Sequence, residues 1–127
     1  MATAPIFTDT VRQEVQAIST ANTARDGTGS PPTVFTAGSS GSRIERVRVV
    51  ATSTVTDGVV RLFLHDGTNS RLLKEVMVTA TTPSTTVETF NATVTFTGGL
   101  MLPNGWSLRA APHNGEPFNV FVEGGDF

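Results

Sequence analysis

The chain contains no cysteine and no tyrosine, and Trp106 is its single tryptophan among 127 residues. The absence of cysteine excludes disulfides, thiol catalysis and thiolate metal sites together. It is also more typical of intracellular assembly than of secreted proteins, which often use disulfides. Charged residues make up only 16% of the chain and the formal net charge is -2. Nucleic-acid binding normally requires a basic excess, so we expect no nucleic-acid partner.

Long hydrophobic runs are also missing. No apolar stretch approaches the ~20 residues of a membrane-spanning helix, and residues 1–5 lack the basic and apolar regions of a signal peptide. We therefore expect a protein that is made in the cytoplasm and has no membrane partner. A chain of 127 residues fits one domain. Such a domain buries roughly two-thirds of the surface of its unfolded chain, enough for a two-layer core.

What the sequence does contain is regular alternation. Apolar side chains occupy every second position in three segments: Val47, Val49 and Ala51; Val60, Leu62 and Leu64; and Phe118, Val120 and Val122. A period of two places successive side chains on opposite faces of a strand. Turn-forming pairs separate such segments, at 57–58, 66–67, 104–105 and 114–115. The pattern predicts an all-β protein with tight connections.

The spacing predicts eight short strands in one β-sandwich domain over residues 15–127, preceded by an N-terminal arm at residues 1–14. The expected strands are 15–23, 33–37, 43–54, 58–65, 72–80, 86–97, 105–111 and 117–123. Eight antiparallel strands fit a jelly roll of two facing sheets. An immunoglobulin-like sandwich is the alternative, although the Cys-Trp-Cys pattern of true immunoglobulin domains is absent.

Two segments depart from simple alternation. Ile44 is out of phase with Val47 and Val49, and a β-bulge near Glu45 and Arg46 would restore the phase. Residues 71–78 also fit one face of a helix, but the segment is short and its neighbours are strands. We therefore expect a bulge in the first segment and a strand in the second.

Candidate catalytic residues do not form a recognisable set. His65 and His113 lie beside turns without the spacing of metal ligands, and the available carboxylates are Asp57, Asp66, Glu116 and Asp126. Most of these carboxylates lie in turns, where they cap the backbone and are solvated. There is no nucleophile elbow and no phosphate-binding loop. We expect no catalytic residues, no metal, no cofactor and no enzymatic activity.

Candidate contact residues come from apolar side chains in polar surroundings. Phe63 and Phe121 alternate with the aliphatic set of their strands, which places them on an outer face where a partner could cover them. Ile6 and Phe7 form the only large apolar pair of the predicted arm, with Arg12 behind them. We expect these five residues to contact a capsid or a neighbouring subunit, with Arg12 contributing orientation more than affinity.

Several segments resemble small β-structured virion proteins of tailed bacteriophages. They are residues 41–44, 61–67 (RLFLHDG), 72–76, 102–108 (LPNGWSL) and 118–120. Within that group the chain is most similar to head decoration, or cement, proteins. The resemblance implies a compact β-fold, a homotrimer, and binding to the major capsid protein on the outside of the phage head. It implies no catalytic motif and assigns no individual contact residue.

Two other functions remain open. A phage tail or fibre component would share the same structural character. A carbohydrate-binding attachment module would normally present exposed tryptophan or tyrosine platforms, whereas Trp106 follows a turn and tyrosine is absent.

Overall fold

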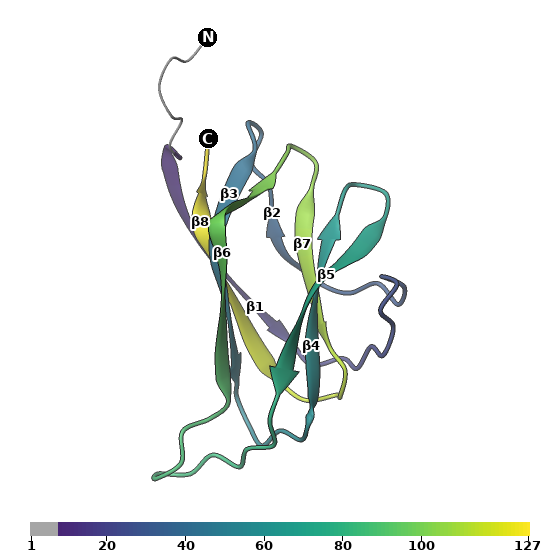
Figure 1. The fold of residues 1–127 in the computed structure, drawn as a ribbon, viewed down its shortest axis with the longest axis vertical. Coiled ribbons are helices and arrows are strands. Elements are labelled where there is room, and N and C mark those ends of the chain that lie inside the picture. Colours follow the sequence, from purple (N-terminus) through teal and green to yellow (C-terminus); the bar gives the residue numbers. More distant parts are fainter. Residues whose placement is uncertain (1–7) are drawn as a thin grey trace.

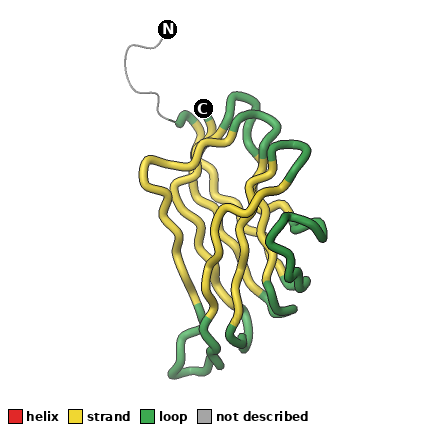
Figure 2. Tube along the Cα trace, turned by 45° about the vertical axis from the view of Figure 1, so that its right-hand side comes forward, coloured by secondary structure: helices red, strands yellow, loops and turns green. Residues whose placement is uncertain are grey.

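The computed structural model describes residues 8–127, which form eight β-strands and contain no helix (Figures 1 and 2). The strands are β1 (Thr10–Ile18), β2 (Thr33–Thr36), β3 (Ser42–Ala51), β4 (Gly58–His65), β5 (Ser70–Val78), β6 (Asn91–Leu102), β7 (Ser107–Pro112) and β8 (Phe118–Asp126). Within these residues no helix is long and apolar enough to cross a membrane.

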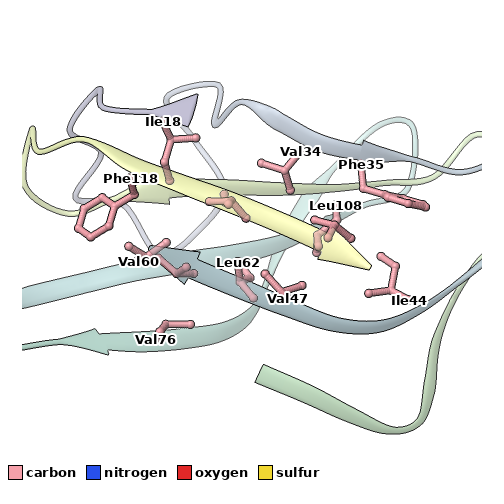
Figure 3. Close-up of a cluster of buried hydrophobic side chains, with 14 of the residues drawn as sticks. Ile18, Val34, Phe35, Ile44, Val47, Val60, Leu62, Val76, Leu108 and Phe118 are labelled. Carbon is pink, nitrogen blue, oxygen red and sulfur yellow. The ribbon is translucent and has the colours of Figure 1, made fainter. Parts of the chain in front are cut away.

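The strands form two four-stranded antiparallel sheets that pack face to face. One sheet has the order β1-β8-β3-β6 and the other has the order β2-β7-β4-β5 (Figure 1). Alternate side chains of both sheets meet between them in one hydrophobic core, because each strand turns every second residue to the same side (Figure 3). Val47 and Val120 from the first sheet and Val60 and Leu62 from the second are fully buried there. The predicted all-β antiparallel sandwich is confirmed.

The first strand begins earlier than its sequence pattern indicated. β1 starts at Thr10, where it pairs with Asp126, and it ends at Ile18, where it pairs with Phe118. Its length is therefore set by its partner β8, and residues 10–14 belong to the sheet rather than to an arm. Residues 19–23, expected in this strand, lie in the following loop. Ile6 and Phe7 lie outside the described residues.

The predicted bulge in β3 is confirmed. The register of β3 shifts between Ile44 and Arg46 against both of its neighbours, β6 and β8. The shift allows Ile44 and Val47 to point into the core together, and both are fully buried. Opposite the bulge lies Gly124, where a Cβ atom would come within 2.1 Å of the Arg43 carbonyl oxygen. Glycine, which has no Cβ atom, is therefore the residue that fits at this point.

The segment that fitted both helix and strand is a strand. β5 pairs along its length with β4, from Ser70 opposite His65 to Val78 opposite Gly58. Only two of its hydrophobic side chains, Val76 and Val78, are fully buried in the core. The pairing with β4 decides the conformation, since the local pattern is compatible with either structure.

Candidate functional site

A long loop, residues 19–32, crosses the outer face of the β2-β7-β4-β5 sheet. The backbone amide of Asn22 donates to the Pro112 carbonyl at 2.9 Å, and the backbone amide of Ala110 donates to the Pro32 carbonyl at 3.0 Å. Farther along the loop, Gly27 packs so closely on Ser70 that a Cβ atom there would lie 2.3 Å from the Ser70 carbonyl oxygen. The loop is therefore fixed both to β7 and to β5, the two strands that flank β4 in this sheet.

Phe63 lies on this outer face and is fully buried. It is outside the inter-sheet core cluster, to which its neighbours Leu62 and Leu64 contribute. Alternation placed Phe63 on the outer face correctly, but the expectation that a partner molecule would cover it is wrong. The chain covers this face with its own loop, in which Pro31 is also buried. Phe63 is a packing residue of a second, smaller layer.

A buried arginine joins the loop to the sheet. Arg61 of β4 is 2% exposed, and its Nε donates to Glu75 Oε2 of β5 at 3.0 Å. Its Nη1 donates to the Asn22 carbonyl oxygen at 3.2 Å and lies 3.2 Å from His113 Nδ1. One guanidinium of β4 thus contacts β5, loop 19–32 and the turn after β7. Buried charges in proteins require such pairing, because an unpaired one costs several kcal/mol.

Glu75 receives a second arginine from the loop. Arg25 Nε donates to the same Oε2 atom at 2.9 Å. The hydrogen bond from Arg25, and after it the one from Arg61, hold the pKa of Glu75 below its ordinary value. The carboxylate is therefore ionised at neutral pH and matches the two cations around it. The single carboxylate leaves one positive charge in this cluster, and the Asp57 carboxylate lines the same concavity.

A concavity of about 530 Å³ lies beside this cluster. Charged and polar side chains line one part, including Arg25, Asp57 and His113, and Val59 and Met77 line another. Asp57 is occupied within the chain, since its Oδ1 accepts the Ala80 amide at 2.8 Å. The mutual hydrogen bonds of the lining groups give the cluster a structural role: they attach loop 19–32 to the sheet.

The two histidines do not come together. His65 Nδ1 lies 2.9 Å from the Ser70 hydroxyl at the end of β4, and His113 contacts Arg61 in the middle of that strand. Among the described residues, no group of three or more histidine, cysteine, aspartate or glutamate side chains is arranged to hold a metal ion. Both histidines are instead engaged in local contacts beside turns.

The outer face of the other sheet exposes apolar side chains. Val11 is 89% exposed and Val15 is 52% exposed, both on β1. Val15 pairs across the strands with Phe121 of β8, which is partly buried. The Arg48 guanidinium of β3 lies over the Phe121 ring, 5.1 Å from its centroid. We call this surface, made by Val11, Val15, Arg48 and Phe121, the β1/β8 face.

Arg12 points to the edge of the sandwich rather than to solvent. Its guanidinium lies 4.2 Å from the Phe35 ring centroid, and its Nη1 donates to the Thr36 carbonyl at 2.7 Å and to Asp126 at 3.1 Å. These contacts join β1 to β2 and β8, so much of the hydrogen-bonding capacity of Arg12 is used within the chain. Its predicted role in an arm is thus replaced, in this structure, by a role at the closed edge of the sandwich.

Trp106 also contributes to packing. It precedes β7 and is a partly buried residue that lies against the hydrophobic core. Its amide donates to the Pro103 carbonyl at 3.0 Å in the tight turn before the strand. A flat exposed indole, of the kind that stacks on sugar rings, is therefore not formed at this position.

Sequence reasoning did not find the cluster of Arg61, Glu75 and His113. The alternation of β4 identified Arg61 as an outward residue, and outward charged residues are normally solvated. The available signal was the glycine- and proline-rich segment at 25–32, which is long for a connection between adjacent strands. Such a loop requires an anchor when it lies on a sheet, and the arginine is that anchor.

Comparisons of the chain with protein-family models, with curated proteins and with solved structures find no match.

Proposed function

We propose that this chain is a structural protein of a bacteriophage virion that binds the major capsid protein on the outside of the head and stabilises the shell. The proposal begins from the resemblance of residues 61–67 and 102–108 to head decoration proteins. The sheet orders β1-β8-β3-β6 and β2-β7-β4-β5 support the expected jelly roll, in which two Greek keys supply alternate strands to two facing sheets.

The observation that carries the proposal is the difference between the two outer faces. Loop 19–32 covers Phe63 on one face, whereas Val11 and Val15 stay exposed on the β1/β8 face beside Phe121. Exposed apolar side chains that lie together favour a protein partner. An apolar surface that carries one cation, Arg48, suits a protein surface better than a polyanion. We assign the capsid contact to the β1/β8 face.

The mechanism requires only binding. A protein that binds the assembled lattice and not the free capsid subunits shifts the equilibrium towards the lattice by mass action. Burial of one aliphatic side chain such as Val15 contributes roughly 1.5–3 kcal/mol. Many copies on one shell multiply a modest contribution from each. Ile6 and Phe7, which precede β1 in the sequence, are proposed to extend this contact.

The proposal is tested by co-sedimentation of the purified protein with expanded capsids of the phage that encodes it. We expect Val15→Glu to weaken binding at least tenfold, because it places a charge in the contact. Met77→Glu is the matched control, since Met77 is 72% exposed but lies on β5 of the other sheet. Equal binding by Val15→Glu and the unchanged protein would exclude the β1/β8 face. Failure of the unchanged protein to bind heads would reject the decoration function.

The same preparation separates the alternatives. Sedimentation with isolated tails but not with heads would assign the protein to the tail or fibre. Retention on a glycan surface, in the absence of binding to either particle, would support an attachment module.

A further inference from the structure

The sandwich is closed along one side and open along the other. On the closed side the backbones of β1 and β2 approach each other, and Arg12 joins them. On the other side the edge strands β5 and β6 make no comparable approach (Figure 1). Five core-facing side chains there are only partly buried, namely Leu73 of β5 and Ala92, Val94, Phe96 and Leu100 of β6, whereas Val76 and Val78 of β5 are buried. We call these five residues the β5/β6 seam.

The free edge of β6 contains no charge and no proline and is not short, and its one irregularity is a register shift against β3 between Thr95 and Leu100. β6 is the longest strand, pairs on one side only with β3, and lies in a stretch without a charged residue from Thr89 to Leu108. Proteins commonly protect edge strands with charges, proline or short length. The other three edges have such features: β1 contains Arg12 and Glu14, β5 contains Lys74, and β2 has only four residues.

The part of the β6 edge before its two glycines is long enough to accept another strand. Gly98 and Gly99 have positive φ values of 81° and 87°, and β6 bends there. Before them, residues 91–97 alternate exposed polar and partly buried apolar side chains without interruption. A partner that pairs with this segment would satisfy its unpaired amide and carbonyl groups and cover Val94 and Phe96 at the same time.

We propose that the β5/β6 seam and the free edge of β6 form the contact between copies of this chain. A second copy is the occupant that the charges favour. The edge is uncharged on every copy, so identical edges meet without like charges opposite each other. A polyanion or a charged protein segment would find no counter-charge on β6. Two copies related by a two-fold axis would pair their β6 edges with each other and leave neither edge free for open-ended association.

This interface is distinct from the β1/β8 face, and pairing of two like edges gives a two-fold contact, which differs from the three-fold contacts of the homotrimer that the resemblance implies. Phe63, which was expected to form such contacts, is buried by loop 19–32 and is unable to do so. The seam therefore replaces it with residues that are half-buried in a single copy and would be fully buried in an oligomer.

The test is the solution mass of the purified full chain, measured by light scattering at micromolar concentration. We expect a dimer for the unchanged protein and about half that mass for Thr95→Glu, as required when a two-fold dimer dissociates. Thr95 is exposed on the outer side of β6 opposite Arg46, so a glutamate there is compatible with the fold. Ala17→Glu is the matched control, because Ala17 is exposed on β1, the other edge strand of the same sheet. It should leave the mass unchanged.

Phe96→Ser tests the seam itself and should also yield monomers. Far-UV circular dichroism establishes whether each variant is folded. If Phe96→Ser is unfolded, the mass of Thr95→Glu alone tests the interface. A monomeric unchanged protein, or an unchanged multimer in Thr95→Glu, would overturn the proposal. A monomer that still binds heads would overturn the seam and leave the capsid function intact. A multimer that binds no heads would support the seam and reject the capsid function.

Discussion

Nη1 of Arg61 lies 3.2 Å from Nδ1 of His113. A guanidinium can only donate hydrogen bonds, so Nδ1 of the imidazole accepts and the ring proton is on Nε2. The turn after β7 is in this way attached to the arginine that also contacts Asn22 and Glu75. Three parts of the chain that are distant in sequence depend on one buried cation.

Arg61→Met should destabilise the protein by roughly 2–4 kcal/mol, because it leaves Glu75 and the Asn22 carbonyl without their buried donor. Arg25→Met removes the other donor to Glu75, but Arg25 has a 67% exposed side chain. Exposed ion pairs contribute about 0–1 kcal/mol, so this control should have a small effect. Urea denaturation of both variants measures the difference. Equal losses of unfolding free energy in the two variants would show that the burial of Arg61 does not increase its contribution to stability.

Phe63→Ala should cost roughly 3–5 kcal/mol, since it creates a cavity beneath loop 19–32. Phe121→Ala should cost about 1 kcal/mol, because Phe121 is partly exposed and loses chiefly its contact with Arg48. Thermal denaturation of the two variants provides the comparison. A larger loss for Phe121→Ala would mean that the covered layer contributes less than its burial indicates.

Asp126 makes the stability of the fold dependent on pH. The Ser42 hydroxyl, and after it Arg12, hold the pKa of Asp126 below its ordinary value of 3.8. A carboxyl group whose folded-state pKa is depressed stabilises the fold above its unfolded pKa, and this contribution is lost as the pH falls through the folded value. The free energy of unfolding should therefore decrease below about pH 4.

Asp126→Asn identifies the part of this decrease that belongs to Asp126. The variant should be less stable than the unchanged protein at pH 7 and should lose less stability on acidification. The difference in unfolding free energy between the two proteins should therefore shrink as the pH falls below the ordinary aspartate range. Parallel curves would assign the acid sensitivity to other carboxylates, of which Glu75 and Asp66 also have lowered pKa values.

Gly124→Ala should disrupt the pairing of β3 with β8 at the bulge. The new Cβ atom would lie 2.1 Å from the Arg43 carbonyl oxygen, which is backbone and cannot rotate away. We expect a loss of at least about 1–3 kcal/mol, the usual cost of overpacking. Gly115→Ala is the matched control, since its Cβ atom would meet nothing closer than 3.6 Å. A tolerated Gly124→Ala would indicate that the bulge can shift to make room.

Removal of residues 1–7 tests the proposed role of Ile6 and Phe7. The deletion ends before β1, so the melting temperature should stay nearly unchanged while capsid binding weakens. Removal of residues 1–14 is the contrast, because it also deletes half of an edge strand and the Arg12 contacts at the closed side. A large fall in melting temperature for the shorter deletion would place Ile6 and Phe7 in the fold instead.

The sequence by itself determined the fold class and most of its strands. Alternation at Val60, Leu62 and Leu64 identified an inward row, and the phase slip at Ile44 located the bulge, because both follow from the two-residue period of a strand. The start of β1 was not determined locally. Its polar residues carry no strong pattern, and pairing with β8 assigns them to the sheet.

The tertiary structure alone decided which outward residues are exposed. Phe63 and Phe121 have similar sequence surroundings, yet loop 19–32 buries the first and leaves the second partly open. Likewise, the sequence alone indicates that Arg61 is a surface charge. In the structure it is buried and contacts Glu75, Asn22 and His113. A period of two specifies a side of the sheet, but what lies over that side depends on where a distant segment of the chain folds back.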